Sequence, residues 1–199
     1  MSYNYIVPFY DFLSRMVFGN RIFLSKSFFF KHIKSYGKIK ILIIGGGTGD
    51  TLHKLPEDAS ITFLDSSEKM LKRAKSRRGN NIEFKLEDCM TFVPKAKYDV
   101  VIIDFFLDQF SDKELWKIIA KIDLFLAQNG RVLVSEFVIN KRWHQYYLRI
   151  MYLFFRFTTG LNTSILPGWE LAMENKFELI SHKFFFSKFI KSAVYLKRI

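Results

Sequence analysis

An apolar run that leads into a cluster of glycines constrains the fold of this chain more than any other feature. Residues 39–44 are apolar at all but one position, and Gly45-Gly46-Gly47-Thr48-Gly49-Asp50 follows them directly. A run of this length and composition, closed by turn residues, predicts a buried strand followed by a tight turn. A short helix is expected next, from Thr51 to Leu55. Such a strand, turn and helix typically bind a ligand at the carboxyl end of the strand.

The same alternation of strands and helices continues along the chain. A strand over residues 60–65 precedes a helix that Ser66 or Ser67 can cap, with Met70, Leu71 and Ala74 on one face. The pattern then predicts, in order, a strand at 81–86, a strand at 98–104, a helix at 112–127 capped by Ser111 and a strand at 130–137. This spacing is typical of an α/β protein whose mostly parallel sheet carries helices on both faces.

The two ends of the chain depart from this alternation. After Asn140 the sequence predicts a long aromatic helix over 142–157, a loop through Gly160, Pro167 and Gly168, and two strands, at 177–186 and 192–198, that form an antiparallel edge. The first 40 residues suggest two helical pieces broken near Gly19-Asn20, folded over the carboxyl ends of the strands. With 199 residues, of which 49% are apolar, the chain suits one domain. We expect this domain to comprise an N-terminal helical lid (1–36), a ligand-binding core (37–139) and a substrate-side helix with the terminal strands (140–199).

The glycine turn favours an adenosyl ligand that carries no phosphate. Gly45, Gly47 and Gly49 follow G-x-G-x-G spacing, and Asp65 comes 20 residues after Gly45, where a carboxylate can accept hydrogen bonds from ribose hydroxyls. A dinucleotide site would need a further glycine, but the sequence has Asp50 or Leu52 at the position concerned. No Walker lysine follows the turn. An acid directly after the turn also argues against bound phosphate.

At this point the chain resembles the class I S-adenosylmethionine-dependent methyltransferases. Its segments 41–50, 63–71, 84–89, 98–104 and 126–134 match the successive motifs of that family in order. The resemblance implies a Rossmann-like, seven-stranded, mostly parallel sheet with an antiparallel C-terminal edge, and S-adenosyl-L-methionine as cofactor. By this resemblance, the glycine turn would bind the methionine moiety and Asp65 would bind the ribose hydroxyls. Met70 and Cys89 would contact the faces of the adenine ring, and Asp88 would bind its amino group. The implied cofactor-binding residues are Gly45, Gly47, Thr48, Gly49, Asp65, Ser66, Met70, Asp88, Cys89, Asp104 and Phe105.

Two further comparisons with known families qualify this expectation. The family often has an acid two residues before the first glycine, whereas this chain has Ile43 there, so the contact to the cofactor's amino group is left open. Residues 3–14 resemble the N-terminal segment of the ubiquinone/menaquinone-biosynthesis C-methyltransferases, whose acceptors are isoprenoid quinone precursors. The second resemblance implies a small-molecule or lipid-like acceptor.

Methyl transfer is an in-line displacement, so positioning alone can supply much of the rate, on the order of 7–11 kcal/mol, without a dedicated base. Residues after the fourth and fifth strands are expected to meet the acceptor, namely Asp104, Phe105, Phe106, Asp108, Gln109, Glu136 and Phe137. The catalytic candidates are Asp108, which follows aromatic residues that can raise its pKa, and His144 and Tyr10. Asp108 can equally be an acid flanking a helix, and His144 and Tyr10 packing residues. Trp169 either lines the acceptor pocket or anchors its loop.

The net charge of +12 is confined to the ends of the chain: +6 over residues 1–40, −1 over 41–139 and +7 over 140–199. This basic excess either reflects composition alone or lies near an anionic surface, which makes peripheral membrane contact an open possibility. It also leaves an RNA methyltransferase as a rival, although residues 104–106 lack the signature of enzymes that methylate nucleic-acid amino groups. A non-catalytic module that binds S-adenosylmethionine is a second rival, which Ile43 keeps open.

A lone cysteine and four scattered histidines predict no metal site. The first eight residues show no secretory signal, so we expect a cytoplasmic protein. The sequence does not indicate the oligomeric state.

Overall fold

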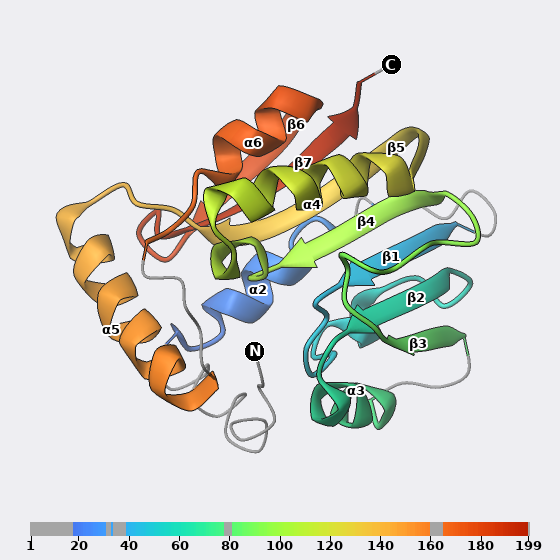
Figure 1. The fold of residues 1–199 in the computed structure, drawn as a ribbon, viewed down its shortest axis with the longest axis horizontal. Helices are drawn as coiled ribbons and strands as arrows, with labels where there is room; N and C mark the ends of the chain where they lie inside the picture. The colour runs from blue at the N-terminus through green and yellow to red at the C-terminus, as the bar shows by residue number, and fades with distance from the viewer. Residues whose placement is uncertain (1–17, 31–32, 34–38, 78–80, 160–164, 199) are drawn as a thin grey trace.

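The computed structural model describes residues 18–30, 33, 39–77, 81–159 and 165–198, which form a seven-stranded sheet with helices on both faces (Figure 1). The strands are β1 (Lys40–Ile44), β2 (Ser60–Asp65), β3 (Ile82–Leu86), β4 (Tyr98–Asp104), β5 (Leu126–Phe137), β6 (Phe177–Phe185) and β7 (Ile190–Lys197). The helices are α2 (Arg21–Ser27), α3 (Glu68–Lys75), α4 (Asp112–Phe125), α5 (Arg142–Thr159) and α6 (Trp169–Lys176), with the 3-10 turns η3 (Leu52–Lys54) and η4 (Leu107–Gln109).

The strand order β3-β2-β1-β4-β5-β7-β6 confirms the predicted fold class. The pairs β3-β2, β2-β1, β1-β4 and β4-β5 are parallel, so their carboxyl ends share one edge of the sheet. β7 lies between β5 and β6 and runs antiparallel to both, which gives the expected antiparallel C-terminal edge. The strand order also reverses between β1 and β4, a switch point at which α/β sheets commonly bind ligands.

The alternation of side chains along the strands divides the core into two layers. On β1, Leu42 and Ile44 pack under α4 and α6, whereas Ile41 and Ile43 pack with η3 and α3 on the opposite face. This is the period of two that a pleated strand imposes on its side chains. Both faces of β1 are therefore apolar, which explains the continuous apolar run in the sequence.

Local sequence signals account for the helix starts. The Ser67 hydroxyl accepts the Met70 N–H, and Met70, Leu71 and Ala74 form the buried face of α3, as predicted. Ser111 caps α4 through a capping box, in which its hydroxyl accepts the Glu114 N–H while the Glu114 carboxylate accepts the Ser111 N–H.

Three elements differ from the expectation. The helix expected at 51–55 is only the 3-10 turn η3, and α4 ends at Phe125, because Leu126 is already extended and pairs with Tyr98 of β4. Helix α6 lies directly after Gly168, where the sequence predicted no helix before the strand at 177, and it buries Trp169 and Met173 against the core.

Helix α5 stands at the carboxyl edge of the sheet, away from its two faces (Figure 1). Its buried residues Leu148 and Tyr152 form a third cluster with Phe18, Phe137 and Phe189. Within the described part of the chain, no helix is long and apolar enough to cross a membrane. The first helical piece expected before Gly19 and the segment 3–14 lie outside the described residues.

Candidate active site

The turn after β1 lines a cavity at the carboxyl edge of the sheet. Gly47 has a φ of +59°, and a Cβ atom built on it would meet no other atom within 4 Å. That space lies in the cavity, where Gly47 is one of the lining residues. Glycine at this position therefore relieves the backbone of left-handed strain and leaves room for a ligand beside the main chain.

Asp65, at the end of β2, is fixed against this turn. Its Oδ2 accepts the Gly47 N–H at 2.8 Å, and its Oδ1 accepts the Ser67 N–H at 2.8 Å. Burial raises the pKa of Asp65, and the two backbone hydrogen bonds oppose that rise. Each carboxylate oxygen has a second lone pair, so the group can still accept hydrogen bonds from a ligand in the cavity.

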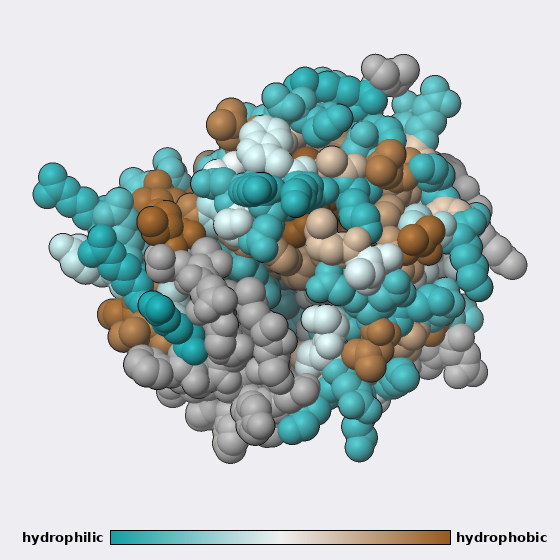
Figure 2. Space-filling view, in the orientation of Figure 1, coloured by the Kyte–Doolittle hydropathy of each residue, from teal (hydrophilic) through white to brown (hydrophobic). Residues whose placement is uncertain are grey.

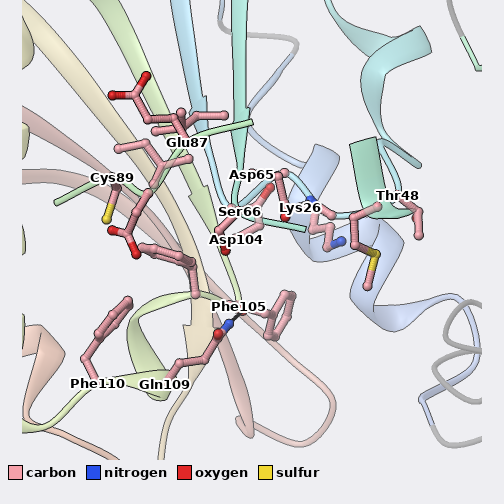
Figure 3. Close-up of a pocket in the computed structure, with 18 residues that line it drawn as sticks. Lys26, Thr48, Asp65, Ser66, Glu87, Cys89, Asp104, Phe105, Gln109 and Phe110 are labelled. Atoms are coloured by element: carbon pink, nitrogen blue, oxygen red, sulfur yellow. Dashed lines mark hydrogen bonds between the residues drawn. The ribbon is translucent and has the colours of Figure 1, made fainter. Parts of the chain in front are cut away.

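The structure brings ten of the eleven predicted cofactor-binding residues to this one cavity (Figure 3). These ten are Gly45, Gly47, Thr48, Asp65, Ser66, Met70, Asp88, Cys89, Asp104 and Phe105. Gly49 is the exception, since a Cβ there would clash with Leu52 and Ala74 inside the core. Burial raises the pKa of the Cys89 thiol to about 12, so Cys89 serves as an apolar wall and not as a thiolate.

A basic side chain from the N-terminal flank also reaches the cavity, and the sequence motifs gave no sign of it. Lys26 of α2 places its Nζ 3.2 Å from Asp50 Oδ1 and 6.0 Å from the centre of the Phe105 ring. Figure 3 shows Lys26 on the side of the cavity formed by the glycine turn. Lys26, Asp50, Asp104 and Ile43 also border a smaller adjoining cavity.

Asp104 ends β4 within this cluster. Burial raises its pKa to about 7, while the charge of Lys26 and a hydrogen bond from Ser135 act in the opposite direction. A carboxyl group in this state gains or loses its proton near neutral pH. It would be held in the ionised form by a cation bound in the cavity.

Aromatic side chains form another wall of the cavity beside the glycine turn, where the Phe106 ring packs against Gly45. Phe105, Phe106 and Phe110 line the cavity together with Gln109, all from the segment that follows β4. Phe105 has a φ of +50°, an uncommon conformation for a residue with a side chain. Its N–H donates to the Ser135 carbonyl at 2.8 Å, and its ring packs 4.8 Å from that of Phe137.

Glu136 fixes the backbone of this aromatic segment through hydrogen bonds. Its Oε2 accepts the N–H groups of Phe106 and Leu107 at 3.0 Å and that of Asp108 at 3.4 Å. Glu136 is fully buried and does not line the cavity. The expectation that it meets the acceptor is therefore replaced by a supporting role for the segment that does.

Asp108, the first catalytic candidate, points away from the cavity. It is buried within η4 and is absent from the cavity lining, because the 3-10 turn directs its side chain toward the core beside Glu136. Burial raises the pKa of Asp108 well above its ordinary value, and burial together with the charge of Asp108 raises the pKa of Glu136. The aromatic surroundings perturb Asp108 as expected, but they also separate it from the site.

His144 and Trp169, two candidates from the C-terminal flank, do not line the cavity either. His144, in the first turn of α5, is fully buried; its Nδ1 accepts the Asn140 N–H at 3.0 Å, and its ring lies 4.8 Å from that of Phe189. Burial lowers its pKa, so it is a neutral packing residue. Trp169 is also buried and donates from Nε1 to the Phe137 carbonyl at 2.8 Å, so it anchors its segment. Tyr10 lies outside the described residues.

Residues 41–130 match the family model of the methyltransferase domain. No curated protein shows significant sequence similarity to the chain. Solved structures are similar over most of its length: the N-methyltransferase NodS from Bradyrhizobium japonicum with S-adenosyl-L-homocysteine has a TM-score of 0.65 and 13% identity, covering 89% of this chain and 84% of that one. Magnesium protoporphyrin IX methyltransferase (ChlM) from Synechocystis PCC 6803 has a TM-score of 0.65 and 17% identity, covering 86% and 80%.

These solved structures share the fold of this chain, and the matched family model covers the strands and turns that surround the cavity. The match over residues 41–130 and the shared fold therefore indicate a methyltransferase domain around the cavity, and they support S-adenosyl-L-methionine as its cofactor.

Proposed function

We propose that the protein transfers the methyl group of S-adenosylmethionine to a small, apolar or lipid-like acceptor that rests on the aromatic wall of the cavity. The observation that carries the proposal is the composition of that wall. Phe105, Phe106 and Phe110 form it, and Gln109 is the polar group among them. Apolar walls with few polar groups suit a hydrophobic small molecule better than a phosphate backbone.

The residues that line the cavity suit the chemistry of the cofactor. The open space beside Gly47 admits the methionine moiety, and the lone pairs of Asp65 can accept the ribose hydroxyls. Met70 and Cys89 offer apolar contacts for the adenine ring, and Asp88 an acceptor for its amino group. Lys26 would attract the cofactor's carboxylate, and Asp104 its ammonium group.

The bound cofactor supplies an electrophilic methyl group on a sulfonium. The residues of the chain bind and orient it, and the aromatic wall excludes water while it holds the acceptor in line with the methyl group. Phe105 is held rigidly for this purpose by Ser135, Phe137 and the loop contacts of Glu136. No attacking group of the protein is required, because the acceptor itself is the nucleophile.

More specifically, we propose that the methyl acceptor is a quinone or another isoprenoid compound. The resemblance of residues 3–14 to the ubiquinone/menaquinone C-methyltransferases supports it. Structural neighbours whose names indicate small-molecule chemistry, such as the magnesium protoporphyrin IX methyltransferase and the pyocyanin biosynthetic protein PhzM, are compatible with it.

The test is methyl transfer from cofactor labelled in the methyl group. The protein is incubated with separate lipid, water-soluble and RNA fractions of a cell extract, with Asp65→Ala as the control variant. Label in the lipid fraction, absent with the variant, supports the proposal. Label confined to RNA supports the rival RNA methyltransferase and contradicts the proposal. Cofactor binding without label in any fraction contradicts the proposal in favour of a binding module.

A further inference from the structure

The outward face of α5 combines an apolar row with a basic row. Tyr146, Ile150 and Leu153 are 65%, 70% and 56% exposed, and Trp143 continues the same row toward the helix start. Their spacing of three or four residues puts them on one side of an α-helix. In Figure 2, hydrophobic residues are visible at the left of the molecule, where Figure 1 shows α5.

Arg142, Arg149 and Arg156 form the basic row, with a spacing of seven residues that places each about two turns further along the same side. All three are exposed. The sequence of α5 contains no acidic residue. Among the residues that the structure describes, no carboxylate forms an ion pair with any of the three.

More basic residues border the helix. Lys141 precedes it, and Lys188 is joined to its start through the hydrogen bond from the Asn140 side chain to the Lys188 carbonyl. Arg21 of α2 lies over the Phe186 ring, at 4.9 Å, and Phe186 packs against Trp143 and Tyr147 of α5. The positive charge therefore extends beyond one helix face to its surroundings.

The surface is close to the active site. The inner face of α5 packs through Leu148 and Tyr152 on Phe137, and the Phe137 ring contacts Phe105, which lines the cavity. Phe137 thus lies between the inner face of α5 and the aromatic wall.

We propose that this face of α5 docks on an anionic lipid bilayer, with the apolar row in the acyl boundary and the arginines at the phosphate groups. A helix with an apolar row beside a cationic one suits the interface plane of a membrane. Charge complementarity favours this occupant over a second copy of the chain, since a copy would bring the same arginines to face these. The inference does not depend on the methyl acceptor.

Sedimentation of the full chain with vesicles tests the proposal. The vesicles consist of phosphatidylcholine alone or with 30% phosphatidylserine added. One variant combines Arg142→Gln, Arg149→Gln and Arg156→Gln, and its control combines Lys113→Gln, Lys117→Gln and Lys176→Gln on α4 and α6. A second variant combines Ile150→Ser and Leu153→Ser, and its control combines Leu124→Ser and Leu171→Ser, which are exposed apolar residues elsewhere.

We expect binding to the anionic vesicles and a strong fall with salt. Each arginine contributes about fivefold, so the triple variant loses on the order of 100-fold in partitioning, and the Ile150/Leu153 variant loses a comparable share. Both controls should retain binding, and all variants should bind S-adenosylhomocysteine normally in calorimetry.

Three outcomes would overturn the proposal. Binding that both control variants weaken as much as the α5 variants would show a diffuse charge effect. Concentration-dependent dimers that the Ile150/Leu153 variant abolishes, without vesicle binding, would identify a second copy as the occupant. Binding to RNA that needs the arginines but tolerates the serines, again without vesicle binding, would identify a nucleic-acid surface.

Discussion

Replacing Asp104 by asparagine should weaken cofactor binding and stabilise the free protein, and both effects should depend on pH. Asp104 is half-buried in the cavity near Lys26 at the end of β4, and desolvation raises its pKa to about 7. S-adenosylmethionine carries an ammonium and a sulfonium charge, so it should bind the ionised form of this carboxyl group. Asparagine keeps the shape of the side chain and removes its titration.

The size of the effect on affinity follows from the ionised fraction. With a pKa of about 7, about 3% of Asp104 is ionised at pH 5.5 and about 90% at pH 8. If only the ionised form binds, the apparent affinity rises roughly 30-fold across this range, or about 2 kcal/mol. The variant should lack this rise, so the two proteins differ most at pH 8.

The effect on stability has the opposite sign. Because the pKa of Asp104 in the folded protein lies above its ordinary value of 3.8, the contribution of this group to stability is present below pH 3.8 and is lost as the pH rises through about 7. A rise of about 3 units corresponds to about 4 kcal/mol, which is an upper limit for the gain that asparagine gives above pH 7. For a chain of this size, each kcal/mol raises Tm by roughly 2–4 °C.

Titration calorimetry with S-adenosylhomocysteine and thermal unfolding, each at pH 5.5 and pH 8, measure the two effects. Glu87→Gln is the control variant, since this carboxyl group lines the same cavity at the end away from Lys26. The reasoning is refuted if Asp104→Asn keeps the pH dependence of affinity shown by the unchanged protein. It is also refuted if the gain in Tm of Asp104→Asn over the unchanged protein is no larger at pH 8 than at pH 5.5.

Three other substitutions test the site and its scaffold. Asp65→Ala should weaken S-adenosylhomocysteine binding at least tenfold in calorimetry, because the ribose acceptors and the hydrogen bond to Gly47 are both lost; unchanged affinity would remove the ribose assignment. Gly46→Ala should lower the unfolding free energy by about 1–3 kcal/mol in urea, because its Cβ would lie 2.2 Å from the Phe63 ring, and a stable variant would contradict that packing. Ser111→Ala should cost about 1 kcal/mol in the same assay through the loss of the α4 capping box, without changing cofactor affinity.

The sequence predicted those parts of the fold that local patterns specify. The strands β1, β2 and β4 are short apolar runs between turn residues, and Ser67 and Ser111 are capping residues whose effect is local. Helix α6 was missed because it is short and its pattern is interrupted by an apolar residue on the outer face. Trp169, Ala172 and Met173 lie on one buried face, but Leu171 is exposed on another, and packing against α4 and the sheet helps to set this helix.

The site divides in the same way. The glycine turn and Asp65 follow from spacing within one βαβ unit, and the structure brings both to the cavity. Lys26 could not be predicted, because its position depends on how α2 packs on the strands far from it in sequence. The sequence correctly predicted that Asp108 lies at the carboxyl edge of the sheet, but its side chain points toward the core and not into the cavity. The direction of a side chain in η4 depends on the hydrogen bonds from the Leu107 and Asp108 N–H groups to Glu136, which the sequence does not reveal.

The isoleucine at position 43 leaves the first strand without the acid that the family often has there, but the cavity does not lack a carboxylate. β1 and β4 are adjacent, with Ile44 opposite Ile103, so Asp104 at the end of β4 lies at the level of Gly45. Ile43 and Asp104 border the same small cavity, together with Lys26. An acid on β4 can therefore face a bound ammonium group from the neighbouring strand. For this reason Ile43 is weak evidence for a non-catalytic module. The pH dependence of cofactor binding in Asp104→Asn decides whether Asp104 on β4 makes the contact to the ammonium group that an acid on β1 would otherwise make.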